Sequence, residues 1–124
     1  MTKIINVKGR QVFDSRGNPT VEAEIFIENG LSASAISPSG ASTGAFEAYE
    51  LRDNNKEFFL GRSVKNAVLN INNKIAPRIK GLNCNHQEEI DKILLEIDGT
   101  DNKKNLGSNA ILAVSLAVSK VSAV

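Results

Sequence analysis

The segment Val21-Glu22-Ala23-Glu24-Ile25-Phe26-Ile27-Glu28-Asn29-Gly30 decides the first part of the fold. Its odd-numbered positions from 21 to 27 are apolar, and its even-numbered positions are mainly acidic. A period of two predicts a β-strand with one buried face and one face in water. The dipeptide Asn29-Gly30 is a strong hairpin signal, so we expect the chain to turn back at this point.

Two further strands are predicted around this one. Residues 4–13 are rich in β-branched and apolar side chains, and Gly9 is interpreted as a bulge or bend within them. The turn-forming residues 14–19 follow, and their arrangement is interpreted as positional rather than catalytic. Residues 31–37 then return as a strand with small side chains. The first third of the chain is therefore predicted to be a three-stranded antiparallel meander.

Helical spacing begins after this meander. Ser63 is expected to cap a helix whose apolar positions are 64, 67, 68 and 71. Asn72, Asn73 and Pro77 are expected to split off a second short segment, residues 74–79, because proline removes a helical hydrogen bond. Gly81 is expected to close that segment.

Two longer helices are predicted in the last third of the chain. Asn85 and Glu88 have the spacing of a capping box and predict a helix that ends at Asp98-Gly99. The last helix, from about Ser108 onward, is apolar on almost all sides, which is typical of burial on more than one face. Either this small domain wraps it tightly, or something further covers it. The fold class is thus α+β, a meander followed by a bundle of about four helices.

Composition limits the possible partners. The 124 residues are expected to form one domain, 1–124, and carry a net charge of +1, which is no electrostatic footprint for nucleic acid or an anionic membrane. Cys84 is the only cysteine, so no intrachain disulfide can form and a reducing compartment fits. The longest apolar stretch, residues 110–118, is about half of the ~20 residues that a membrane span needs, so no membrane span is expected. We see no signal peptide and expect a cytoplasmic protein.

The segment Pro38-Ser39-Gly40-Ala41-Ser42-Thr43-Gly44 is the candidate binding loop. It has no large side chain, and its two glycines allow backbone angles that other residues rarely adopt. This composition is typical of a mobile loop that closes on a small polar ligand. The alternative is a long connection that is merely rich in turn formers. A nucleotide site is disfavoured, because neither a P-loop nor a GxGxxG motif occurs.

Five segments together resemble the amino-terminal domain of the enolase (phosphopyruvate hydratase) family. They occur in the family's order and span nearly the whole chain: 14–22 (DSRGNPTVE), 38–44 (PSGASTG), 47–53 (EAYELRD), 95–100 (LEIDGT) and 109–117 (NAILAVSLA). The resemblance implies a cap domain that packs on a catalytic barrel domain of ~250 residues, and this barrel is absent from the chain.

The resemblance also implies an activity for the full-length protein. Enolases are lyases of glycolysis that interconvert 2-phosphoglycerate and phosphoenolpyruvate plus water, as cytoplasmic homodimers that use two Mg²⁺ ions per active site. The acid, the base and the main metal ligands belong to the barrel. We therefore expect no catalytic residue in this fragment, no activity from it alone, and weak or no Mg²⁺ binding.

Some roles carry over residue by residue. Ser42 matches the serine that gives its hydroxyl and carbonyl oxygens to the second Mg²⁺, and Gly40 and Ala41 match residues that lie against substrate. Ser39, Thr43 and Gly44 complete this substrate loop. The family's first strands face the partner subunit, so Arg10 and Glu22 are candidates for ion pairs at the dimer interface.

Two other functions remain open at this stage. An isolated domain of this kind could be a non-catalytic binding module, displayed at the cell surface or secreted without a signal peptide, that engages host proteins; Lys103-Lys104 is the suggestive feature. The chain could also be the cap of a related enzyme with another substrate, although the loop of residues 39–44 is particular to the enolase branch. His86 is interpreted as an exposed structural residue rather than a metal ligand.

Overall fold

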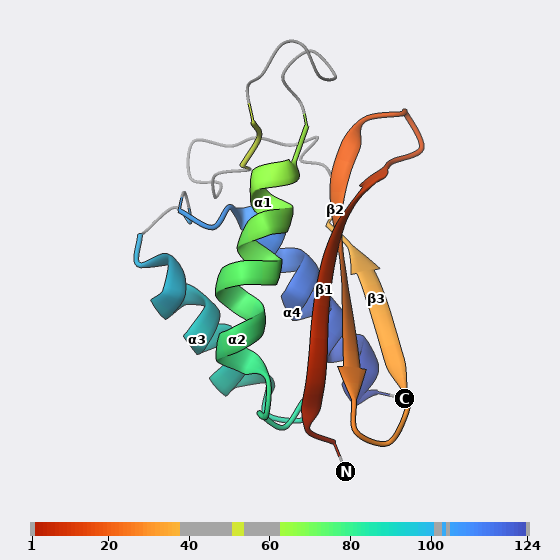
Figure 1. The fold of residues 1–124 in the computed structure, drawn as a ribbon, viewed down its shortest axis with the longest axis vertical. Helices are drawn as coiled ribbons and strands as arrows, with labels where there is room; N and C mark the ends of the chain where they lie inside the picture. Colours follow the sequence, from red (N-terminus) through yellow and green to blue (C-terminus); the bar gives the residue numbers. More distant parts are fainter. Residues whose placement is uncertain (1, 38–50, 54–62, 101–102, 104, 124) are drawn as a thin grey trace.

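The computed structural model describes residues 2–37, 51–53, 63–100, 103 and 105–123 (Figure 1). Three strands form one antiparallel sheet in the order β1-β2-β3: β1 (Ile4–Phe13), β2 (Pro19–Ile27) and β3 (Ser32–Ile36). The predicted meander is therefore confirmed. The four apolar positions of β2 are all buried, as their alternation predicted: Val21, Ala23, Ile25 and Ile27.

The interpretation of Gly9 as a bulge is wrong. Gly9 pairs in regular register with Ala23, and the irregularity of β1 lies between Ile4 and Asn6 instead. The reason for glycine is steric, because a Cβ at this position would lie 2.8 Å from the Cβ of Ile71. Gly9 is therefore the point at which a helix packs directly on the backbone of β1.

That helix is continuous where we expected a break. It consists of α1 (Lys65–Asn70), a π-helical segment η2 (Ile71–Ile75) and α2 (Ala76–Ile79), which follow one another without a gap. Pro77 lies in the first turn of α2, immediately after the π-helical turn. A proline cannot bond the carbonyl four residues earlier and crowds it, so a wider turn at this point relieves both problems without ending the helix.

The other two helices are α3 (Gln87–Asp98) and α4 (Ser108–Ser122). The predicted end at Gly99 is confirmed, since Gly99 adopts a left-handed conformation and its N–H donates to the carbonyl of Leu95. The predicted capping box is wrong. α3 begins after His86 with no side-chain cap, and the Asn85 side chain instead accepts a hydrogen bond from the Ser122 hydroxyl at 2.7 Å.

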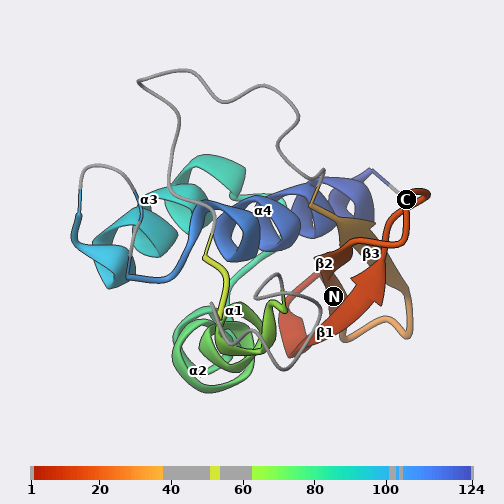
Figure 2. The same cartoon turned by 90° about the horizontal axis from the view of Figure 1, so that it is seen from above.

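Helix α4 is the centre of the packing. It contacts β2 and β3 on one face of the sheet and also contacts α3, whereas α1, η2 and α2 lie along β1 (Figure 2). Burial of α4 on more than one face is confirmed by eight buried residues: Asn109, Ala110, Ile111, Ala113, Val114, Ala117, Val118 and Val121. Leu112 and Leu116 on its outer side keep 39% and 38% exposure.

Candidate functional site

The candidate substrate-loop residues Ser39, Gly40, Ala41, Ser42, Thr43 and Gly44 lie outside the residues that the structure describes. What the structure does describe is the chain on either side of them. Ser37 precedes residues 38–50, and Leu51 follows them. The contacts of these two residues fix the two ends of the candidate loop.

The entry side is held by the first residues of β2. The N–H of Ser37 donates to the carbonyl of Val21 at 2.8 Å, and the Thr20 hydroxyl donates to the carbonyl of Ser37 at 2.7 Å. Thr20 is 1% exposed and Ser37 is 2% exposed. Both backbone groups of Ser37 are therefore bonded inside the protein, and these bonds hold the residue in place.

The exit side is held by the start of α4. The N–H of Leu51 donates to Oδ1 of Asn109 at 3.1 Å, and Nδ2 of Asn109 donates to the carbonyl of Leu51 at 2.9 Å. Oδ1 of Asn109 also accepts a hydrogen bond from the N–H of Ala110 at 3.1 Å. The Asn109 amide thus bonds Leu51 as a neighbouring strand would, with one donor and one acceptor.

Gly107 makes this contact sterically possible. Its φ of +94° is one that residues with a Cβ rarely adopt. A Cβ at Gly107 would lie 2.5 Å from the Cβ of Leu51 and 2.5 Å from Oδ1 of Asn109. Glycine at position 107 is therefore required both for the backbone conformation before α4 and for the close approach of Leu51.

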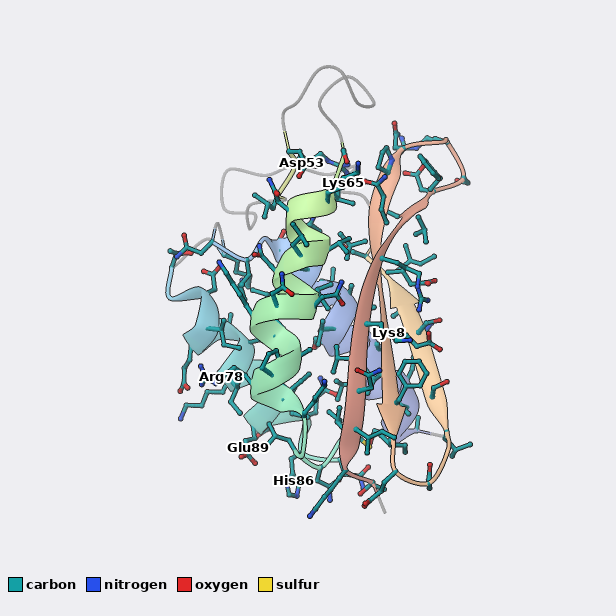
Figure 3. All side chains as sticks on the ribbon, in the orientation of Figure 1. Lys8, Asp53, Lys65, Arg78, His86 and Glu89 are labelled. Carbon is teal, nitrogen blue, oxygen red and sulfur yellow. The ribbon has the colours of Figure 1, made fainter. Side chains whose placement is uncertain are left out.

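The two residues after Leu51 continue the attachment. Nη1 of Arg52 donates to the carbonyl of Pro19 at 2.8 Å, so this side of the segment also reaches the start of β2. The carboxylate of Asp53 accepts hydrogen bonds from the N–H groups of Lys65 at 3.1 Å and Asn66 at 2.9 Å, at the first turn of α1 (Figure 3). Asp53 therefore caps α1 from a distant part of the chain.

The expectation that Ser63 caps α1 is consequently wrong. Its hydroxyl donates to Oε1 of Gln11 at 2.9 Å, and the same oxygen accepts a hydrogen bond from the N–H of Val64 at 2.9 Å. A capping residue that lies outside the adjoining sequence gives no local signal, so the role of Asp53 was missed.

A short turn organises the chain before β2. The carboxylate of Asp14 accepts hydrogen bonds from the N–H groups of Arg16 and Asn18, both at 2.9 Å, and the Asp14 N–H donates to the carbonyl of Asn18 at 2.9 Å. These contacts agree with a positional role for Asp14. The turn leads directly to Pro19 and Thr20, which hold the two ends of the candidate loop.

The candidate interface residues lie on the sheet face opposite α4. Nη1 of Arg10 donates to Oε1 of Glu22 at 2.5 Å, and its Nη2 donates to Oε1 of Glu24 at 2.7 Å. The hydrogen bonds to Glu24 and then Glu22 raise the pKa of the Arg10 guanidinium, and the bond from Arg10 lowers the pKa of Glu24. Arg10 and Glu22 are thus paired across β1 and β2 within one chain.

A buried carboxylate holds the connection between α3 and α4. Asp98 is 1% exposed, and it accepts hydrogen bonds from the N–H of Leu106 at 2.6 Å, the N–H of Thr100 at 3.0 Å and the Thr100 hydroxyl. Burial alone would raise the pKa of Asp98, but these hydrogen bonds, led by that from Leu106, together lower it. Asp98 is therefore ionised in the fold and fixes the residues that lead to Gly107.

Neither a metal-ligand cluster nor a membrane-spanning helix occurs in the described ranges. They contain no group of three or more His, Cys, Asp or Glu residues that could hold a metal ion. Nδ1 of His86 lies 3.6 Å from the carboxylate of Glu89, and Figure 3 labels both exposed residues near the start of α3. None of the helices within those ranges has both the length and the apolar character of a membrane span.

Comparison with known proteins identifies the family of this chain. The family described as "Enolase, N-terminal domain" matches residues 4–124. An enolase from Pelagibacter ubique (strain HTCC1062) is 57% identical to the chain over 123 residues, which cover 99% of the chain and 29% of that protein. The chain thus spans less than a third of the length of this curated relative. Because the family match covers almost every residue, the chain belongs to the enolase family, as its N-terminal domain.

Proposed function

We propose that the chain is the cap of a full-length enolase, a Mg²⁺-dependent lyase that interconverts 2-phosphoglycerate and phosphoenolpyruvate plus water in glycolysis. The observation that carries this proposal is the 57% identity over 99% of the chain to a protein named enolase. The rest of the protein then supplies the barrel domain, with the acid, the base and the main metal ligands. We place the enzyme in the cytoplasm.

Within this enzyme, residues 39–44 are the part of the cap that meets substrate. Gly40 and Ala41 have so little bulk that the backbone can approach a phosphate or carboxylate closely. Ser42 is proposed as a ligand of one Mg²⁺ through its oxygens, which suit a hard cation. Ser39, Thr43 and Gly44 support them. The contacts of Ser37 and Leu51 favour this role, because they fix the residues on both sides of the segment.

The described residues contain no group of three or more His, Cys, Asp or Glu side chains that could hold a metal ion. In the proposed enzyme, the barrel domain supplies the main ligands of Mg²⁺. When bound, Mg²⁺ would stabilise the negative charge that builds up as a proton is removed next to a carboxylate. The cap's own contribution is to bring backbone groups and the Ser42 oxygens to the substrate.

The proposed enzyme is a homodimer, and Arg10 and Glu22 belong to its interface. Their pairing within the sheet holds both side chains in place on the face opposite α4, where a second subunit could meet them. Ordered charges on a rigid surface favour correct pairing between subunits more than they add affinity.

Substitution of Ser42 tests the proposed activity. In the full-length protein, Ser42→Ala should lower kcat for dehydration of 2-phosphoglycerate by roughly a hundredfold, the size of effect expected when one preorganised group is lost. Ser32→Ala is the control, because Ser32 is an exposed serine of β3. A wild-type protein that does not dehydrate 2-phosphoglycerate would overturn the function, and an active Ser42→Ala variant would overturn the role of Ser42.

A further inference from the structure

We infer that Asn109 and Thr20 are positioning residues of the proposed dehydration reaction. They bond the two chain positions, Leu51 and Ser37, between which the proposed substrate-binding residues lie. The inference rests on the proposed function and adds two residues to it that do not themselves touch the substrate. It is carried by contacts among described residues on both sides of positions 38–50.

The contact made by Asn109 is specific to its side chain. An asparagine amide carries one acceptor oxygen and a donor nitrogen, so it can bond the N–H and the C=O of the same residue. Asn109 makes both bonds to Leu51 while it is only 3% exposed. Asn109 is buried whereas Leu51 is partly buried, so loss of either bond removes a fixed partner of the Leu51 backbone.

The two sides of the segment converge on three consecutive residues of β2. Pro19 accepts a hydrogen bond from Arg52 on the exit side. Thr20 donates to Ser37, and Val21 accepts from Ser37, on the entry side. β2 is the central strand of the sheet and packs against α4, which itself carries Asn109.

These contacts fix the positions of Ser37 and Leu51 independently of the residues between them. The entry and exit points are bonded to β2 and α4, which pack against each other, so this packing sets the position of one point relative to the other. A reaction that depends on the exact placement of its groups is sensitive to the positions of these two flanking residues, since a shift of ~1 Å can cost about a hundredfold in rate. A contact that only stabilised the fold would have no such effect on the reaction.

Asn109→Asp in the full-length protein is the sharpest test. Aspartate keeps the shape and the acceptor for the Leu51 N–H, but it places an oxygen against the carbonyl of Leu51. A negative charge at the start of α4 is favourable to the helix, so the variant should fold. We expect kcat/KM for 2-phosphoglycerate to fall by about tenfold to a hundredfold.

Asn72→Asp is the matched control. The Asn72 amide also bonds both backbone groups of one residue, but that residue is Gly9 of β1: its Oδ1 accepts from the Gly9 N–H at 2.8 Å, and its Nδ2 donates to the Gly9 carbonyl at 3.2 Å. Both variants should lower the Tm, whereas only Asn109→Asp should lower kcat/KM and speed hydrogen exchange of residues 51–53.

Thr20→Val provides a second route if Asn109→Asp does not fold. Valine has the shape of threonine but cannot donate to the carbonyl of Ser37, so this variant should also lower kcat/KM. If both variants keep kcat/KM within about twofold of wild type, the positioning role is overturned and the proposed function stands. A wild-type protein with no activity toward 2-phosphoglycerate would instead overturn the proposed function, and the inference with it.

Discussion

The side chain of Asn72 holds the edge of the sheet at Gly9 through both backbone groups of that residue. The Gly9 N–H donates to Oδ1 of Asn72 at 2.8 Å, and Nδ2 of Asn72 donates to the Gly9 carbonyl at 3.2 Å. β1 is an edge strand, so these groups would otherwise have no partner in the sheet. Asn109 bonds Leu51 in the same way, which means that asparagine amides stand in for a missing strand at two places.

Gly9→Ala should destabilise the protein by about 1–3 kcal/mol, because the new methyl group would lie 2.8 Å from the Cβ of Ile71. The Cβ of Ile71 is fixed to the helix backbone, so a rotamer change cannot relieve the contact. The free energy of unfolding in urea measures the effect. Ile5→Val, a conservative change at a residue of the same strand that is 55% exposed, should stay within about 0.5 kcal/mol of wild type, and an equal loss from both would contradict the steric explanation.

The sequence predicts those features of the fold that depend on local patterns of residues. The alternation in residues 21–27 predicts which face of β2 is buried, because strand periodicity acts within a few residues. Gly9 shows the limit of this reasoning, since its cause is Ile71, which is distant in the sequence and touches it only after folding. The same limit applies to the capping of α1 by Asp53.

For the candidate site, the motifs identified the family but not the contacts between them. The segments 47–53 and 109–117 both support the enolase resemblance, yet nothing in either predicts that Asn109 bonds Leu51. That contact also needs Gly107, whose left-handed φ and close neighbours follow from the packing of α4. Side-chain to backbone bonds between distant segments leave no periodic signal, so such positioning residues are found only in the structure.

Asp98→Asn should reduce stability by about 1–3 kcal/mol at neutral pH, since a charged acceptor of three hydrogen bonds is lost. The folded-state pKa of Asp98 is lowered. Its contribution is therefore fully present above the ordinary aspartate pKa and disappears as the pH falls through the lower folded value. Urea unfolding from pH 7 to pH 3 should show the gap between wild type and variant closing in acid, and a constant gap would contradict this assignment.

Asp53→Ala should cost about 1 kcal/mol, because the N–H groups of Lys65 and Asn66 at the start of α1 lose their acceptor. The free energy of unfolding is again the measurement. Asn66→Ala is the matched control, since it removes a side chain but keeps the backbone N–H that Asp53 binds. If Asn66→Ala were as costly as Asp53→Ala, the cap would not be the cause.

Glu22→Lys in the full-length protein should weaken the proposed homodimer, because it places a positive charge beside Arg10 and reverses the charge of this part of the sheet. Analytical ultracentrifugation should show a larger monomer fraction at low protein concentration. Glu96→Lys makes the same change of charge at an exposed residue of α3 and should leave the dimer unchanged. A sedimentation profile identical to wild type for Glu22→Lys would exclude this residue from the interface.

Gly107→Ala should destabilise the protein more than Gly81→Ala does. Both glycines have a positive φ, of +94° and +90°, so both substitutions carry the backbone strain of a left-handed residue. Gly81 has nothing within 4 Å of an added Cβ, whereas at Gly107 the Cβ would lie 2.5 Å from Leu51 Cβ and from Asn109 Oδ1. The difference in Tm between the two variants therefore isolates the close contact at the exit side of the candidate loop. Hydrogen exchange should accelerate at residues 51–53 in Gly107→Ala alone, because only that substitution displaces Leu51 from the Asn109 amide; equal Tm losses with unchanged exchange would show that strain is the whole effect.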